Sequence, residues 1–119
     1  MEETSLPHGE QGLSQNLKKD LDNIEKFQLL ADIFKQLGDS TRLRLFWLLC
    51  HCEACVTELS AMMEMSSPAI SHHLRLLRSS GLIVSRRKGK EVYYHAADTA
   101  QSQLLHRMIE QVSEIACPN

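Results

Sequence analysis

The run from Ser66 to His95, "SSPAISHHLRLLRSSGLIVSRRKGKEVYYH", most strongly constrains what this chain can fold into. A helix tolerates Pro68 only in its first turn, so Ser66 or Ser67 is expected to cap a helix that starts there. Gly81 is expected to end that helix. The β-forming residues that follow, interrupted by the glycine-containing "RRKGKE", predict two short strands joined by a turn.

Apolar residues at spacings of three and four predict three helices before this run and one after it. The first turns helical from Leu21 and ends at Gly38; the second starts at a cap, Asp39 or Ser40; the third is the short "VTELSAMMEM". The second is apolar over most of its surface, which is typical of a central helix. Its expected inward face carries Leu43, Phe46, Trp47 and Cys50. The fourth helix of the chain should be buried through Ile70, Leu74 and Leu77. The last helix is expected to begin at Asp98 or Thr99, with an apolar stripe of Leu105, Met108, Ile109, Val112 and Ile115.

This order of elements predicts a mainly α fold with a small β-hairpin wing (α+β), a winged helix-turn-helix of about five helices and two strands. At 119 residues and 43% apolar composition the chain has enough material for one domain with a modest core. Residues 1–15, polar and containing proline and glycine, are interpreted as a flexible N-terminal arm. Residues 16–119 are then the DNA-binding and dimerisation domain.

Charge is concentrated where such a fold meets DNA. Between His72 and His95 six basic residues stand against one acid, Glu91, so that segment is +5 and the remainder −7, for a total of −2. A solvated basic face is the alternative, but the charges fall on the helix and hairpin that a winged helix uses. Lysines and arginines would bind phosphates, and small or hydrogen-bonding residues early in the helix would approach base edges. The candidate DNA-binding residues are Ser66, Ser67, Ala69, Ser71, His72, Arg75, Arg78, Arg86, Arg87, Lys88 and Lys90.

Apolar stripes on the first and last helices predict a homodimer, because one short chain has little left to bury them against. A two-fold dimer would carry its two DNA-reading helices into successive major grooves of double-stranded operator DNA. The alternative is that both helices pack on their own domain.

Three of the four cysteines lie close together in "LLCHCEACVTEL". Cys52 and Cys55 have Cys-x-x-Cys spacing and follow the second helix, so both thiolates can chelate one ion. Cys50 is either a small core residue or a ligand. Cys117 lies near the end of the chain. It is either a ligand, in a site within one chain or across a dimer, or a cysteine without a role in the site. His51 and His8 are further candidates. Sulfur ligands favour zinc, cadmium, lead, copper(I) or arsenite over magnesium or calcium.

Several stretches together resemble the ArsR/SmtB family of bacterial metal-responsive repressors. They are "IFKQLGDSTRLRLFWLL", "CVTEL", "SSPAISHHLRLLRSSGLI" and "RRKGKEVYYH", and they cover about residues 31–95. The resemblance implies a homodimeric winged helix that occupies its operator when metal-free and leaves it when metal binds.

The family's metal positions match this sequence only in part. The resemblance implies a cysteine pair at the start of the third helix; Cys55 matches its first member, and Thr57 replaces the second. A second family site lies on the last helix. There Asp98 and Glu114 match, but Ala100 and Gln111 occupy the histidine positions, so we expect that site to be absent. His106 falls outside its register and is expected to be a surface residue.

Two other functions are open. A disulfide or polysulfide between Cys52 and Cys55, or between Cys50 and Cys117, would make a redox-sensing repressor of the same fold. A metal carrier that does not bind DNA is disfavoured by the +5 segment. We expect no enzyme, since the sequence has no nucleophile–base pair, phosphate loop or His-Glu-x-x-His motif. The acidic, polar N-terminus resembles no signal peptide and no apolar run is long enough for a membrane, which places the protein in the cytoplasm with reduced thiols.

Overall fold

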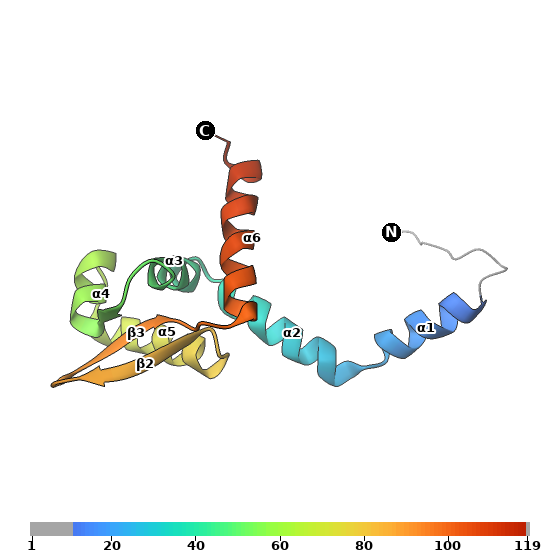
Figure 1. Cartoon of the computed structure of the whole chain (residues 1–119), viewed down its shortest axis with the longest axis horizontal. Helices are drawn as coiled ribbons and strands as arrows, with labels where there is room; N and C mark the ends of the chain where they lie inside the picture. Colours follow the sequence, from blue (N-terminus) through green and yellow to red (C-terminus); the bar gives the residue numbers. More distant parts are fainter. Residues whose placement is uncertain (1–10, 119) are drawn as a thin grey trace. The chain divides into compact units, whose positions relative to one another are not determined.

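The structure, a computed structural model, describes residues 11–118, and within them the chain forms six helices and one small sheet (Figure 1). The described residues fall into two units, divided between Asp32 and Ile33. The elements are α1 (Gln11–Leu21), α2 (Ile24–Leu37), α3 (Ser40–Leu49), β1 (Ala54–Cys55), α4 (Val56–Met63), α5 (Ser67–Ser79), β2 (Ile83–Lys88), β3 (Glu91–Ala96) and α6 (Ala100–Ala116). The predicted winged helix-turn-helix is present, with one helix and one short strand more than expected.

The additional helix, α1, includes part of the segment that we expected to be an arm. It begins at Gln11, is rich in good helix formers, and carries an ion pair of 2.9 Å between Lys18 and Asp22 one turn apart. Its weak apolar stripe is why periodicity missed it. The helix ends at Leu21, and α2 begins after Asn23, whose side chain accepts a hydrogen bond from the backbone N–H of Lys26. Residues 1–10 of the expected arm, including His8, lie outside the described residues.

The core of the second unit lies between α3, α4, α5 and the sheet. Its fully buried residues include Leu45, Phe46, Leu49, Leu59, Ile70, Leu74, Leu77, Leu82 and Ile83. The predicted buried side of α5 is therefore confirmed. Of the predicted inward face of α3, Phe46 is buried and Cys50 packs half-buried against the core, but Trp47 is 41% exposed, and the other buried residues of the helix are Leu45 and Leu49. An almost uniformly apolar helix offers no unique period from which to choose its buried face.

Side-chain caps fix where three helices of this unit begin. Asp39 accepts from the backbone N–H of Arg42 at the start of α3, at 3.0 Å. Ser66 accepts from Ala69 at the start of α5, and Thr99 caps α6. Each cap satisfies a backbone donor that the first helical turn leaves free. The structure thus selects Asp39, Ser66 and Thr99 from the predicted pairs.

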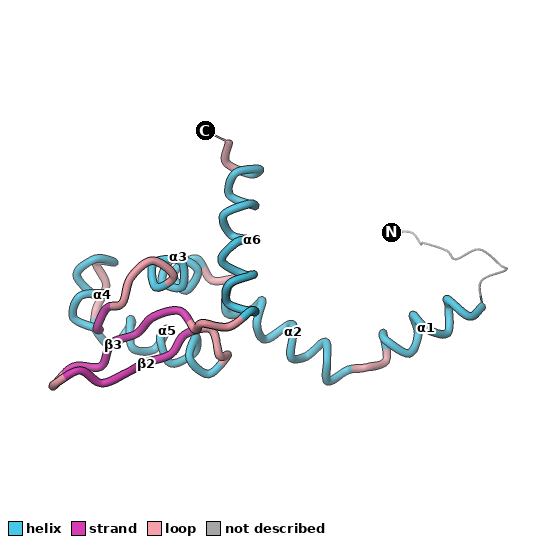
Figure 2. The backbone as a smooth tube through the Cα atoms, viewed as in Figure 1, coloured by secondary structure: helices cyan, strands magenta, loops and turns pink. Residues whose placement is uncertain are grey.

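The sheet has the order β1-β3-β2 and is antiparallel throughout. Figure 2 shows its strands in magenta. The predicted hairpin is β2 and β3, and Gly89 in its turn has a φ of +64°, which glycine adopts at low cost. Strand β1 was not predicted, because its two residues become a strand only by pairing with β3: Ala54 lies opposite Tyr94 and Cys55 opposite Tyr93. The segment that carries Cys52 and Cys55 is thereby attached to the wing.

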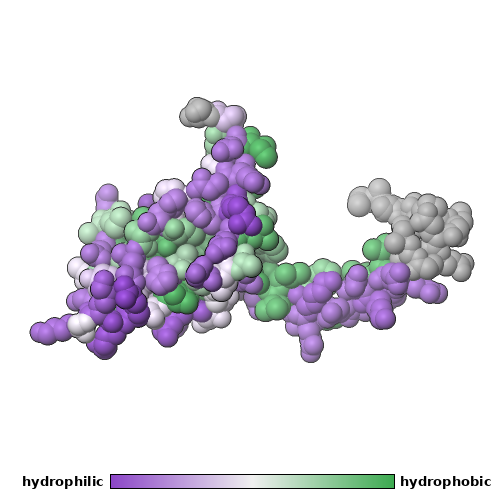
Figure 3. Space-filling view, viewed as in Figure 1, coloured by the Kyte–Doolittle hydropathy of each residue, from purple (hydrophilic) through white to green (hydrophobic). Residues whose placement is uncertain are grey.

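Hydropathy differs between the two ends of this unit. The end of the hairpin is hydrophilic, whereas apolar side chains reach the surface on the C-terminal part of α6 (Figure 3). The exposed apolar residues of α6 are Leu104, Met108, Val112 and Ile115. None of the helices in residues 11–118 combines the length and the apolar character that crossing a membrane would require.

Candidate nucleic-acid interface and metal ligands

Helix α5 presents the side chains predicted to read DNA. Ser67, Ser71, Arg75 and Arg78 are exposed and recur at helical spacing, so they form one stripe, away from the buried side of the helix. The hydroxyls of Ser67 and Ser60 lie 3.1 Å apart and connect α5 with α4, the first helix of the motif. The burial of Ile70, Leu74 and Leu77 on the other side holds this stripe towards solvent.

The remaining predicted residues of this motif differ in how available their side chains are for contact with DNA. His72 is exposed, and its Nδ1 lies 3.0 Å from Nη2 of Arg75, so the two side chains are in contact on the surface. Ser66 is committed to capping the helix. Ala69 is half-buried, which leaves it a small contact area.

Two basic residues of the wing, Arg86 and Lys88, pair with a carboxylate that sequence reasoning overlooked, Glu53, which lies just before β1. Glu53 accepts two hydrogen bonds from Arg86, at 2.6 and 2.9 Å, and lies 3.7 Å from Nζ of Lys88. These hydrogen bonds from Arg86 lower the pKa of Glu53 to about 2. Within residues 11–118, Arg87 and Lys90 form no salt bridge and are exposed. The wing therefore offers two free cations and two that are already shared.

The four cysteines do not gather at one point. Cys52 is exposed, Cys55 is 5% exposed in β1, and Cys117 is exposed at the end of α6. The backbone N–H of Cys55 donates to Oε1 of Glu58, which holds the start of α4. Cys50, half-buried after α3, has a pKa raised to about 11, first by burial and then by the negative charge of Glu110. All four are free thiols.

One cluster of ligand-type side chains does form, and sequence reasoning missed it. In the part of the chain that the structure describes, His51, His106 and Glu110 are the only three such groups whose donor atoms all lie within 4.8 Å of one another. His106, which we expected at the surface, is half-buried and faces His51. The spacing of His106 and Glu110, four residues apart on a helix, was the available signal; His51 is 55 positions away.

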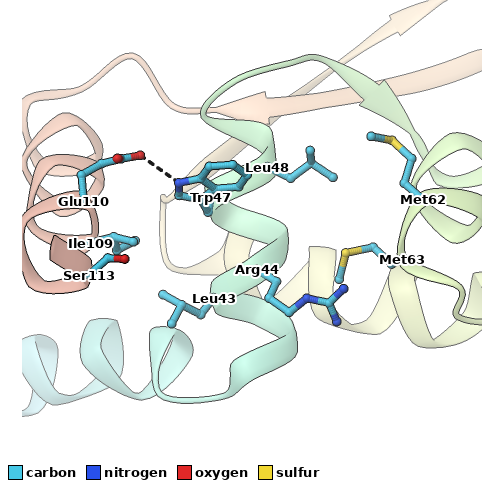
Figure 4. A pocket seen from close by; sticks show the side chains of 9 residues that line it. All are labelled: Leu43, Arg44, Trp47, Leu48, Met62, Met63, Ile109, Glu110 and Ser113. Atoms are coloured by element: carbon cyan, nitrogen blue, oxygen red, sulfur yellow. Dashed lines mark hydrogen bonds between the residues drawn. The ribbon is translucent and has the colours of Figure 1, made fainter. Parts of the chain in front are cut away.

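Trp47 supports this cluster from α3. Its Nε1 donates to Oε2 of Glu110 at 2.9 Å, and both side chains line a cavity of about 570 Å³ between α3, α4 and α6 (Figure 4). Its ring also lies 4.5 Å, centroid to centroid, from that of His51. The indole hydrogen bond is the main cause of a lowered pKa at Glu110, with His106 contributing.

Comparison with known proteins gives this geometry its context. Residues 39–85, from the cap of α3 into the wing, match the family described as "Bacterial regulatory protein, arsR family". A transcriptional repressor SmtB homolog from Synechocystis is 39% identical over 92 residues, which cover 77% of this chain and 70% of that protein. The chain belongs to the ArsR/SmtB family.

A second ArsR/SmtB relative, a cadmium resistance transcriptional regulatory protein CadC homolog from Staphylococcus aureus, is 36% identical over 100 residues. These cover 83% of this chain and 82% of the relative. Among solved structures, the homodimeric winged helix-turn-helix DNA-binding domain of Mb0332 from Mycobacterium bovis superposes with a TM-score of 0.71. It is 26% identical and covers 78% of this chain and 85% of that one.

Membership of the ArsR/SmtB family settles the general class of function. The chain is a DNA-binding transcription regulator and not an enzyme. The matched residues include the helix-turn-helix, α4 and α5, that carries most of the predicted DNA-reading side chains.

Proposed function

We propose that this protein is a cytoplasmic homodimeric repressor that leaves its operator when a thiophilic ion binds at Cys52 and Cys55. The observation that carries the proposal is the attachment of this cysteine segment to both parts of the DNA-binding motif. Strand β1 pairs with wing strand β3, and Cys55 immediately precedes α4. A ligand at these two sulfurs therefore acts on the wing and on the helix-turn-helix at once.

The burial of Cys55 supplies a mechanism for the coupling. Its side chain is almost fully covered, whereas Cys52 is exposed, so an ion bound to both sulfurs must shift the start of α4 or the end of β1. The ion changes DNA affinity only through its different affinity for the two arrangements, and such coupling is typically about 1–3 kcal/mol, or roughly 5- to 150-fold. DNA binding should weaken the ion's affinity by the same factor.

Two thiolates leave a coordination shell incomplete. Cys50 and Cys117 are the proposed additional sulfur ligands, and His8 is the proposed nitrogen ligand. Zinc, cadmium, lead and arsenite are the candidate ions, because each binds thiolate well. The name of the Staphylococcus aureus relative refers to cadmium resistance, which supports a thiophilic inducer.

The proposed dimer buries the apolar face of α6. Its four exposed apolar residues recur at helical spacing and would be covered by a second copy, as the homodimeric state of the Mycobacterium bovis domain suggests. Such a dimer would place its two α5 helices about 34–36 Å apart, one turn of DNA.

The test starts from reduced, metal-free protein and DNA selected from a random library by that protein. Cadmium and arsenite are titrated anaerobically, with sulfur-to-metal ultraviolet absorption reporting the thiolates and fluorescence anisotropy reporting the DNA. We expect stoichiometric binding, release of DNA, and loss of both in Cys52→Ser and Cys55→Ser. Cys52→Ser alone is decisive if Cys55→Ser fails to fold, since Cys52 is exposed. Cys117→Ser tests the ligand from α6.

Two results would redirect the proposal. Tight ion binding that leaves DNA affinity unchanged would contradict the regulatory role. No ion binding, together with oxidant-dependent DNA release and a disulfide in mass spectrometry, would establish the redox-sensing alternative.

A further inference from the structure

A triangle of donor atoms lies at the junction of α3 and α6. Nε2 of His51 and Nε2 of His106 are 3.2 Å apart. Oε2 of Glu110 lies 3.7 Å from the first and 3.3 Å from the second. We infer that these three side chains form a metal site for a divalent ion of the zinc class, separate from the cysteines.

The edges of the triangle match one face of a coordination tetrahedron. Zinc bonds of 2.0–2.2 Å at tetrahedral angles separate neighbouring ligand atoms by roughly 3.3–3.6 Å. The three observed separations run from 3.2 to 3.7 Å. An ion can therefore sit just outside the plane of the three atoms with normal bonds to each, and the side chains need only small adjustments.

A carboxylate oxygen can only accept hydrogen bonds, and Oε2 of Glu110 lies near Nε2 of both histidines. A divalent cation beside the three atoms would accept a lone pair from each of them.

Trp47 holds the carboxylate ready for this role. Its indole N–H donates to Oε2 of Glu110, the same oxygen that faces the two histidines, and its ring packs against His51. Hydrogen bonds to ligating carboxylates orient the ligand and typically affect affinity 10- to 100-fold.

The ligand set favours a zinc-class ion over lead and arsenite, the softest of the ions proposed for the cysteines. Two imidazoles and one carboxylate suit zinc and cobalt, with water in the fourth position. Cys50 lines a small cavity with His106, yet its sulfur lies outside the triangle.

The site stays within one chain and remains open in a dimer. At about 100° per residue, His106 and Glu110 point roughly 120–180° away from the exposed apolar stripe of α6. A second copy covering that stripe leaves this face free. An ion here links α6 to the residue directly before Cys52, so it fixes one end of the cysteine segment. The inference that an ion binds here does not depend on the proposed function, whereas any effect of that ion on DNA affinity does.

Cobalt(II) titration of the reduced, full-length protein tests the site. Trp47 is the only tryptophan in the chain and touches the cluster, so a paramagnetic ion bound there should quench its fluorescence. In the double variant Cys52→Ser/Cys55→Ser, visible absorption should show cobalt d–d bands without intense thiolate charge transfer, and zinc should displace the cobalt. We expect His106→Gln and Glu110→Gln to weaken binding roughly tenfold or more.

Matched controls separate this site from the cysteines. His72→Gln, an exposed histidine on α5, and the double variant Cys52→Ser/Cys55→Ser should both retain quenching and d–d bands. Trp47→Phe should weaken cobalt binding roughly 10- to 100-fold, measured by absorption. Circular dichroism verifies the fold of each variant. Trp47 quenching that survives both His106→Gln and Glu110→Gln would overturn the inference, as would loss of quenching and of the d–d bands in the double cysteine variant. Neither result would affect the test of ion-dependent DNA release.

Discussion

The candidate DNA-binding region and the histidine cluster are built in opposite ways. The first, α5 with the β2–β3 hairpin, uses consecutive residues within Ser67–Ala96, and each segment is specified by its own caps, glycines and apolar period. The second brings together His51 and His106, which are 55 positions apart and meet only after α3 and α6 pack. One region is fixed by local sequence, the other by tertiary structure.

The comparison also shows where the two regions meet. Glu53 follows Cys52 in the chain and lies close to His51, yet its side chain pairs with Arg86 on the wing. Strand β1 makes the same connection through the backbone. A change in the segment from His51 to Cys55 can therefore reach the wing through one ion pair and one short strand, with no need for a longer route.

The largest expected effect comes from the core that both regions share. Leu74, 1% exposed, lies on the inner side of α5. Replacing it with alanine should lower the free energy of unfolding by about 2–5 kcal/mol, because it removes a buried side chain and leaves a cavity. Urea denaturation at one fixed protein concentration measures this loss.

The half-buried Leu76 on the same helix is the matched control, and its alanine variant should lose clearly less stability. Leu74→Ala should also weaken cobalt quenching of Trp47 and DNA binding together, at denaturant concentrations that leave the wild type folded. Loss of DNA binding with cobalt binding fully retained would mean that the two regions fold independently.

A smaller effect should separate the regions. Arg75 is exposed in the middle of the stripe on α5, so Arg75→Ala should weaken DNA binding roughly 5- to 150-fold, the range for one specific contact. Cobalt binding should not change. Fluorescence anisotropy at several salt concentrations measures the first, and Trp47 quenching the second. Arg44→Ala, which removes the same charge from α3, should leave DNA affinity nearly unchanged; an equal loss there would indicate a general charge effect.

Sequence reasoning was sufficient for the helix-turn-helix and the hairpin, for physical reasons. Serine at a cap, proline in a first turn and glycine after a last turn act through neighbouring residues, so Ser66 and Gly81 could be interpreted without a structure. Strand β1 could not be found this way, because Ala54 and Cys55 depend on β3 for their pairing. The buried face of α3 depends equally on its neighbours.

The candidate sites were harder to predict for the same reason. The cysteine segment stands out by composition, and the ligand role of Cys52 and Cys55 stays a prediction. His106 was set aside because only its register with other residues of the last helix was considered, whereas its partner is on α3. Glu53 was overlooked because a single acid before a strand carries no signal until Arg86 is placed beside it.

The smallest expected effect concerns this overlooked carboxylate. Glu53→Gln removes the charge that Arg86 and Lys88 share, and it frees two cations on the wing to bind phosphates. We expect DNA affinity to rise a few-fold at low salt. The slope of log affinity against log salt should become more negative by about 0.9 for each phosphate gained. Both follow from anisotropy titrations across a salt series, with Glu91→Gln, on the same hairpin, as the charge-matched control.

The pH dependence of DNA binding tests the role of Glu53 in a second way. The pKa of Glu53 falls from its ordinary 4.5 to about 2, so the stabilisation from its ion pair is complete above the ordinary value and is lost only as the pH drops towards 2. Between pH 5 and 8 the wing pairing is therefore constant, and the effect of Glu53→Gln on DNA affinity should be the same throughout. A Glu53→Gln effect that changed between pH 5 and 8 would show that a group other than this carboxylate sets the position of the hairpin.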